Sequence, residues 1–266
     1  MSENHPKEKT VLITGGTGAI GKAIARLIAM KNNYKVVILA RNANKAKSTV
    51  NELKISTGNP NISFVIADLS DKKEIQSIAK AWTEPLHVLI NNAGTTPRQR
   101  METADGIEMQ FATNVLGYFW MTKYFTPILQ QSVPARIINV ASYWAGNLNL
   151  DDLEFTQRSY DNGTAYRQSK QANRMLTVAF AERLKPLGIT VNVCHPGEVN
   201  SKLSNDLGFG GHESPEQGAA TPVWLATSED VEGITGSYFE HLHQTRCQFS
   251  GDKQGIEKLY RICEEY

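Results

Sequence analysis

The stretch from Thr10 to Gly21 constrains the fold of this chain more than any other part of the sequence. Thr10–Thr14 is a short apolar run, Gly15–Gly21 contains four glycines, and apolar residues then recur at helical spacing as far as Ile28. This order predicts a strand, a glycine turn and a helix. Such a turn presents backbone N–H groups and a helix N-terminus to a phosphate, and its glycines let a pyrophosphate approach the backbone.

Two nucleotide-binding motifs overlap in this turn. Gly16, Gly18 and Gly21 match the spacing of a dinucleotide fingerprint, while Gly16 to Gly21 followed by Lys22 satisfies most of a nucleoside triphosphate loop. The second motif requires Ser or Thr after its lysine to hold Mg²⁺, and Ala23 has no oxygen to offer. The sequence therefore favours a dinucleotide over a triphosphate, with a purely structural glycine turn as the remaining alternative.

Strands and helices continue to alternate after the glycine turn. Strand alternating with helix predicts an α/β fold with a parallel, doubly wound sheet that binds its ligand at the carboxyl ends of the strands. No repeat, low-complexity tract or linker interrupts the 266 residues, so we expect a single domain spanning 1–266 with helices on both faces of the sheet. The later apolar runs that predict strands are 35–40, 63–67, 86–90, 136–140 and 189–193.

The end of the second strand predicts which nucleotide is bound. A site for NAD places an acidic side chain about 20 residues after the glycine fingerprint, whereas this strand ends in Ala40 followed by Arg41. Arg41 could bind a 2′-phosphate, with Lys45 or Lys47 adding charge nearby, which favours NADP over NAD. The alternative is a solvated basic residue at a helix start. Asp68, after the third strand, suits either an adenine amino group or the cap of the next helix.

Asparagines lie where a sheet of this kind binds its ligand. The fourth strand delivers Asn91-Asn92-Ala93-Gly94, whose amides can tie neighbouring strands and whose small residues let a ligand approach. A helix expected from about Asp105 carries Asn114 on its apolar face. A buried amide must be hydrogen-bonded, so Asn114 either binds a backbone group or fixes a water that shuttles protons.

Tyr166 and Lys170 lie four residues apart at the head of a predicted helix, so their side chains share one face. A free tyrosine titrates near ~10, and a neighbouring cation lowers its pKa toward the range where it exchanges protons with a substrate. The alternative is an exposed tyrosine stacked on a lysine stem. Ser142 follows the fifth strand without the Gly-x-Ser-x-Gly pattern of a hydrolase nucleophile, so we expect its hydroxyl to donate a hydrogen bond to a substrate oxygen.

Taken in order, these motifs resemble the short-chain dehydrogenase/reductase family, with its Rossmann-like fold, from Thr10 to about Phe239. The resemblance implies that Tyr166 is the general acid/base and that Lys170 lowers its pKa and holds the nicotinamide ribose. It also implies that Ser142 orients the carbonyl and that Asn114 anchors a relay water. The residues that carry the resemblance are Thr14–Gly21, Asn91–Gly94, Asn114, Ser142, Tyr166-x-x-x-Lys170 and Pro196–Ser201.

The same resemblance implies a set of residues that contact the nicotinamide cofactor. These are Gly15, Thr17, Gly18, Ile20, Gly21, Arg41, Asp68, Leu69, Asn92, Ala93, Gly94, Tyr166, Lys170, Pro196, Gly197, Val199 and Ser201.

Departures from the compact family pattern indicate a branch. Ala19 stands where compact members usually carry glycine, so the glycine spacing resembles that of extended members. The gap between Ser142 and Tyr166 exceeds the compact norm by one short loop, 147–155, and this insertion resembles the retinol dehydrogenase and WW-domain oxidoreductase branch. Substrates there tend to be lipophilic alcohols or carbonyls. The segment 200–215, rich in Gly, Ser and Asn, has the composition of a mobile substrate lid.

Composition and charge argue against other classes of protein. Lysine and arginine number 28 against 27 aspartates and glutamates, so no global field favours nucleic acid or an anionic membrane as partner. Three scattered cysteines fit a reducing compartment, and no signal peptide or membrane span is evident, so we expect a cytoplasmic protein. His241, His243 and Cys247 lack a fourth ligand, so no metal site is expected. We expect His195 to be structural rather than a base.

We therefore expect an NADP-dependent oxidoreductase that moves a hydride between nicotinamide C4 and the carbonyl or alcohol carbon of a small to medium, lipophilic substrate. One alternative is a non-catalytic NADP(H)-sensing protein on the same fold, and a P-loop kinase is a third. A terminal amphipathic helix over 252–264 is suited to subunit contact or to closing the pocket, and we expect a homodimer or homotetramer. The expected catalytic residues are Asn114, Ser142, Tyr166 and Lys170.

Overall fold

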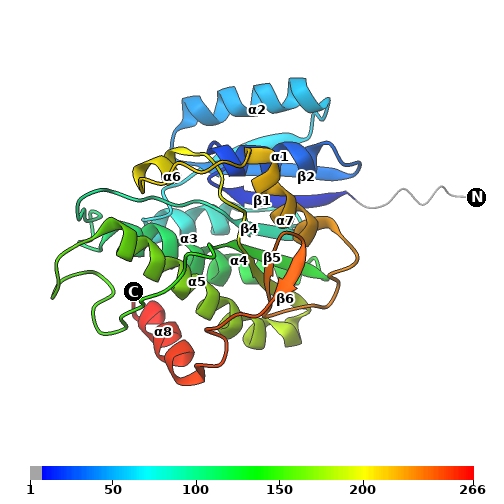
Figure 1. Cartoon of the computed structure of the whole chain (residues 1–266). Coiled ribbons are helices and arrows are strands. Elements are labelled where there is room, and N and C mark those ends of the chain that lie inside the picture. The colour runs from blue at the N-terminus through cyan, green and yellow to red at the C-terminus, as the bar shows by residue number, and fades with distance from the viewer. Residues whose placement is uncertain (1–7) are drawn as a thin grey trace, which may run out of the picture.

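The computed structural model describes residues 8–266, and its helices flank one central eight-stranded sheet (Figure 1). The strand order is β3-β2-β1-β4-β5-β6-β7-β8, and every neighbouring pair is parallel except β7 and β8. This confirms the parallel, doubly wound sheet predicted from the sequence. The strands are β1 Lys9–Thr14, β2 Tyr34–Ala40, β3 Ile62–Ile66, β4 Val88–Asn91, β5 Ala135–Val140, β6 Ile189–Cys194, β7 Tyr238–Glu240 and β8 His243–Thr245.

Helices cover both faces of this sheet (Figure 1). The first face packs on α1 Ala19–Ala29, α2 Ala43–Thr57 and α7 Pro215–Thr227. The second face packs on α3 Lys72–Ala81, α4 Gly117–Gln130, α5 Asn162–Leu184 and α8 Lys253–Glu265. Within residues 8–266 there are also three short helices, η1 Phe111–Leu116, η2 Lys185–Leu187 and α6 Lys202–Asp206.

The central strands are apolar along most of their length because both of their faces are covered. In β1, Val11 and Ile13 belong to the core beneath α1 and α7, whereas Leu12 belongs to the core beneath α4 and α5. All three side chains are fully buried. Successive side chains of a strand point to opposite faces, so an uninterrupted apolar run is what a doubly covered strand requires.

The helix expected from about Asp105 begins later, with helical residues from Met109 that lead into η1, and that prediction is wrong at its start. Gly106 has a φ of +80°, which ends any helical path there. Glu102 and Glu108 then form an isolated antiparallel bridge. The buried Glu108 carboxylate accepts from the backbone N–H groups of Gln110 and Phe111 at 2.9 and 2.7 Å, so it caps the start of η1.

The segment at His241 is a tight turn. His241 and Leu242 have φ values of +47° and +65°, which reverse the chain between β7 and β8. Two central residues with positive φ are typical of a hairpin turn that matches the twist of its strands.

Among residues 8–266, no group of three or more His, Cys, Asp or Glu side chains is placed to hold a metal ion. No helix in that range is long and apolar enough to cross a membrane.

Candidate active site

The glycine turn joins β1 to α1 and forms one wall of the site. Gly15 has a φ of +66°, and a Cβ added there would lie 2.8 Å from the Cα of Ala93. The position therefore needs glycine both for its backbone conformation and for the close approach of the β4 end. Gly18, the N-cap of α1, gives no side-chain cap, and no acidic residue occupies the first turn of the helix. The N–H groups of that turn are thus left to a ligand, and an anion suits them.

Side-chain hydrogen bonds hold the ends of the strands in register beside this turn. The hydroxyl of Thr14 accepts from the backbone N–H groups of Asn92 and Ala93 at 2.8 and 3.1 Å. The Asn92 amide donates to the Thr14 backbone carbonyl at 2.9 Å, and the Asn91 amide donates to the side-chain oxygen Oδ1 of Asn139 at 2.9 Å. The expectation that these amides tie neighbouring strands is confirmed.

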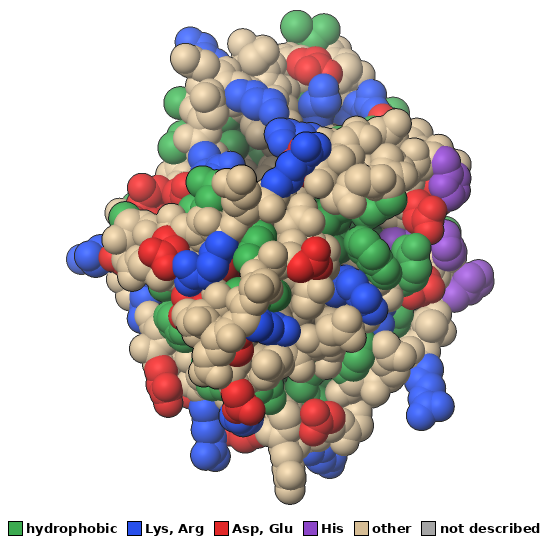
Figure 2. All heavy atoms as spheres, turned by 60° about the vertical axis from the view of Figure 1, so that its left-hand side comes forward, with side chains coloured by type: hydrophobic (Ala, Val, Ile, Leu, Met, Phe, Trp, Pro, Cys, Tyr) green, Lys and Arg blue, Asp and Glu red, His purple; other side chains and the backbone are tan. Residues whose placement is uncertain are grey.

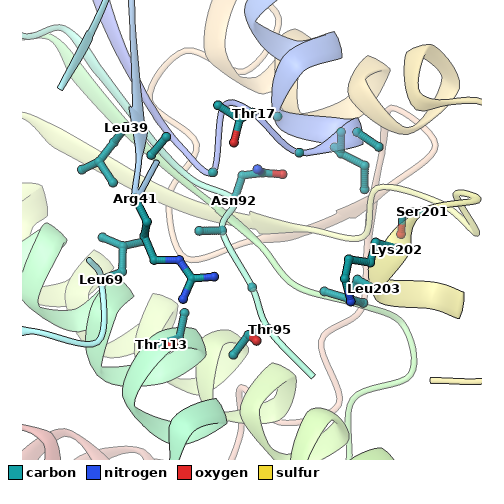
Figure 3. A pocket seen from close by; sticks show the side chains of 18 of the residues that line it. Thr17, Leu39, Arg41, Leu69, Asn92, Thr95, Thr113, Ser201, Lys202 and Leu203 are labelled. Atoms are coloured by element: carbon teal, nitrogen blue, oxygen red, sulfur yellow. The ribbon is translucent and has the colours of Figure 1, made fainter. Parts of the chain in front are cut away.

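A cavity of about 430 Å³ opens at the carboxyl ends of β1, β2 and β4 (Figure 3). Its walls include most of the residues expected to contact a cofactor, but not Pro196, Gly197, Val199, Tyr166 or Lys170. The expected residues that line it are Gly15, Thr17, Gly18, Ile20, Gly21, Arg41, Asp68, Leu69, Asn92, Ala93, Gly94 and Ser201.

Several lining residues were missed by sequence reasoning. They come from the loop after β4, from η1 and from α6, and they are Thr95, Thr96, Thr113, Lys202, Leu203 and Asp206. Figure 3 shows Ser201, Lys202 and Leu203 on the side of the cavity opposite Arg41. Only the family spacing around Ser201 could have indicated their position, because α6 carries no motif of its own.

The side chain of Arg41 extends into the cavity near Leu69 and Thr113 (Figure 3). Its guanidinium lies 3.7 Å from the carboxylate of Asp68. The capping role considered for Asp68 is wrong, because the N-cap of α3 is Asp71, which accepts from two backbone N–H groups. Asp68 instead accepts from the N–H and hydroxyl of Ser70 at 2.9 and 2.7 Å, which fixes its carboxylate at the cavity edge.

Positive charge gathers at this end of the molecule. Figure 2 shows Lys and Arg side chains clustered at the top of one face, the end occupied by α2 in Figure 1. The helix follows Arg41 and carries Lys45, Lys47 and Lys54, of which Lys45 also lines the cavity. A chain with a net charge of only +1 thus has a local field that suits phosphate groups.

Tyr166 lies buried at the head of α5, with 6% of its surface exposed, beside the equally buried Ser142. A hydrogen bond joins their hydroxyls. Burial raises the pKa of Tyr166, and the hydrogen bond from Ser142 opposes only part of this rise, so the pKa is about 12. Lys170 is not among the groups that shift this pKa, so the expectation that it lowers the pKa of Tyr166 is not met in the protein alone.

The ammonium of Lys170 binds the backbone at the end of β5 and lies over the ring of Tyr166. Its ammonium donates to the carbonyl of Val140 at 3.0 Å and lies 5.6 Å from the centre of the Tyr166 ring. The hydroxyl of Tyr118 donates to the same carbonyl at 3.2 Å. Burial lowers the pKa of Lys170 to about 8, since only 3% of the residue is exposed.

Asn114 lies fully buried on η1, a π-helical segment in which the N–H of Gly117 reaches back to the carbonyl of Ala112. Its amide donates to the carbonyl of Thr95 at 3.0 Å and accepts from the Thr95 N–H at 2.8 Å. The side chain therefore binds a backbone group, one of the two roles considered for it. A π-segment within a longer helix is frequent at functional sites, and here it continues directly into α4.

The residues after β6 form the base of the segment 200–213. The N–H of Asn200 donates to the carbonyl of Glu213 at 3.1 Å, and the N–H of His212 donates to the carbonyl of Glu198 at 2.8 Å. The carboxylate of Glu213 accepts from the N–H of Glu198. Between these anchors lie α6 and a glycine-rich tip, so the two ends of the expected lid are fixed to each other.

The insertion between Ser142 and Tyr166 is fixed to α5. The buried carboxylate of Asp152 accepts from the N–H groups of Thr156 and Gln157 and lies 3.2 Å from the guanidinium of Arg158. The amide of Gln168 donates to the carbonyl of Leu153 at 2.7 Å. This loop is therefore a wall beside the site, held by the same helix that carries Tyr166.

Comparison with known proteins agrees with this arrangement. The model of the short chain dehydrogenase family matches residues 9–208. Human retinol dehydrogenase 11 is 35% identical over 249 residues, which cover 88% of this chain and 78% of that protein. An uncharacterised protein from Mycobacterium paratuberculosis is 26% identical, with a TM-score of 0.81 over 97% of this chain and 93% of its own.

A second solved structure, the NADP complex of Pseudomonas aeruginosa RhlG, is 26% identical with a TM-score of 0.70 over 88% of this chain and 94% of its own. The resemblance drawn from scattered short motifs is thus matched by similarity along most of the sequence. Fold, site and sequence agree that the chain belongs to the short-chain dehydrogenase family, in a branch similar to the retinol dehydrogenases.

Proposed function

We propose that this protein is an NADP(H)-dependent oxidoreductase that interconverts carbonyl and alcohol groups of small to medium, lipophilic molecules. The observation that carries the proposal is that three buried side chains meet at the carboxyl end of β5. They are the phenol of Tyr166, the hydroxyl of Ser142 and the ammonium of Lys170. Open-sheet enzymes bind their ligands at this edge. Similarity to human retinol dehydrogenase 11 supports a lipophilic alcohol or carbonyl as substrate.

The cavity fits a phosphorylated dinucleotide. The uncapped first turn of α1 offers N–H groups for a pyrophosphate, and Arg41 with Lys45 offers positive charge for a 2′-phosphate. When bound, NADP(H) supplies or accepts the hydride. The protein positions that chemistry, and the NADP complex of a neighbour with the same fold supports this choice of cofactor.

In carbonyl reduction, the neutral phenol of Tyr166 would donate its proton to the substrate oxygen. A pKa of about 12 keeps this phenol protonated at neutral pH, which is the form that reduction needs. Ser142, hydrogen-bonded to that phenol, would donate to the same oxygen and orient the carbonyl. Lys170 would place positive charge next to the tyrosinate that forms, so the free energy of that charged state falls.

Replacing Tyr166 by Phe tests this role. We expect Tyr166→Phe to bind NADPH as the natural protein does, because the ring stays in place, and to lose turnover by about 10²–10⁴-fold, the usual contribution of general acid–base catalysis. Fluorescence titration of NADPH and assays of aldehyde reduction on one preparation measure both quantities. Unimpaired turnover would contradict the proposed role.

The alternative of a non-catalytic NADP(H) sensor predicts cofactor binding without turnover. A screen of aldehydes, ketones and alcohols with both cofactors separates it from the enzyme.

The cytoplasmic location and the homo-oligomer expected from the sequence stay predictions. Imaging of a tagged protein measures the location, and light scattering of the purified protein measures the oligomeric state.

A further inference from the structure

We propose that Trp144 and Phe209 form an aromatic clamp that holds the group attached to the reacting carbonyl and that selects flat, unsaturated groups such as aryl rings. The inference rests on the proposed function, since it concerns the part of the substrate that lies beyond the reacting carbon. Neither residue belongs to the motifs that identify the family. Both come from the two loops that flank the buried tyrosine.

Trp144 is the fixed side of the clamp. Its backbone N–H donates to the hydroxyl of Ser142 at 3.0 Å, and its ring centre lies 6.4 Å from that of Tyr166. The guanidinium of Arg167, the residue after Tyr166 on α5, lies 5.7 Å from the indole, and the carbonyl of Arg167 accepts from the N–H of Gly146. The indole is thus held beside the ring of Tyr166, and its backbone is fixed to the hydroxyl of Ser142.

Phe209 is the movable side. Its ring centre lies 5.6 Å from that of Trp144 at an interplanar angle of 81°, yet 48% of the residue is exposed. Gly208 and Gly210 flank it with φ values of +88° and +75°, and a Cβ at Gly208 would meet nothing within 4 Å. The carbonyl of Ser204 accepts from the N–H groups of Phe209 and Gly210, so the ring moves by rotation of its own exposed side chain while the base of the segment stays paired with 198–200.

The contact between these rings has the geometry that a substrate ring would adopt. Aromatic rings prefer edge-to-face or offset contacts with centres about 4.5–7 Å apart. An aryl group joined to the carbonyl would lie against the indole of Trp144, and Phe209 would close on it from the other side. A saturated ring of similar size lacks the flat face and the quadrupole, so it gains only the apolar contact.

The experiment measures kcat and KM for NADPH-dependent reduction of benzaldehyde, cyclohexanecarbaldehyde and propanal. Phe209→Leu keeps an apolar side chain of similar size on an exposed loop tip and removes the ring. We expect benzaldehyde to lose about fivefold in kcat/KM, through KM, relative to propanal, and cyclohexanecarbaldehyde to lose less. Ile55→Ala, at a residue 85% exposed on α2, is the control and should leave all three values unchanged.

A binding measurement keeps the clamp testable apart from turnover. Calorimetry of the protein loaded with NADP⁺ compares benzamide with cyclohexanecarboxamide, and Phe209→Leu should weaken benzamide selectively, by about fivefold. If the natural protein reduces no aldehyde while this selectivity holds, the proposed function fails and the clamp stands. If Phe209→Leu lowers all three aldehydes equally, or leaves benzaldehyde and benzamide unaffected, the clamp is wrong.

Discussion

The cofactor half and the substrate half of the site are held together by different kinds of contact. The cofactor half, at the ends of β1, β2 and β4, is formed by backbone in close contact, with Thr14 and Asn92 joining the strands. The substrate half is formed by the loops after β5 and β6, which fold back on side chains such as Asp152 and Glu213. Backbone contacts leave little choice of residue, whereas loops held by side chains can change composition and so adapt to different substrates.

Matched glycine replacements sharpen this comparison, and they have the largest expected effect on stability. Gly15→Ala should lower the free energy of unfolding by about 2–4 kcal/mol, because positive φ and a contact with the backbone of Ala93 act together. The φ of Gly208 is also positive, but a Cβ added there meets nothing within 4 Å. We therefore expect Gly208→Ala to lower the free energy of unfolding by only about 1–2 kcal/mol. Urea denaturation measures both, and equal losses would contradict the proposed difference between the halves.

The choice of nucleotide tests the cofactor half by itself. Arg41→Ser should raise the KM for NADPH about tenfold, the effect of one charge-assisted hydrogen bond, and leave the KM for NADH within about twofold. Because Arg41 is largely exposed and also pairs with Asp68, a larger effect is not expected. A natural protein that uses NADH as well as or better than NADPH would overturn the proposed preference.

The substrate half should respond to pH through His195. Burial, together with the nearby His241 and Arg174, lowers the pKa of this imidazole to about 4, while Glu198 opposes them. The unfolded chain, with a pKa near ~6.5, binds the proton first, so stability is complete above that pH and falls as pH drops toward 4, by about 3 kcal/mol at most.

His195→Gln should therefore flatten the pH dependence of unfolding between pH 6.5 and 4. His212→Gln, at an exposed histidine of the same half, is the control and should retain the natural profile. A natural profile in the His195 variant would show that another group titrates.

The fold and the cofactor half could be read from the sequence because local rules determine them. Uninterrupted apolar runs predict buried parallel strands, and Gly15 of the first turn is required both by its positive φ and by the close approach of Ala93. Arg41 and Asn92 could be placed because they follow directly from the ends of strands, where a parallel sheet brings its ligand site together.

The substrate half could not be predicted in the same way because its contacts are distant in sequence. Nothing local indicates that Phe209 meets Trp144. The direction of the Tyr166 pKa was missed for a related reason. The spacing of Tyr166 and Lys170 predicts that the two side chains are near each other. Only the structure shows that burial raises the pKa of Tyr166 and that the ammonium of Lys170 binds the carbonyl of Val140.

The most direct test of the central claim follows the hydride itself. The protein is incubated with benzaldehyde and with NADPH carrying deuterium at C4 of the nicotinamide, in separate reactions for the 4R and 4S labels. If the site transfers hydride as proposed, mass spectrometry finds one deuterium on the carbinol carbon of benzyl alcohol from one of the two labels. Oxidation of NADPH with no deuterium in the alcohol from either label would contradict the account.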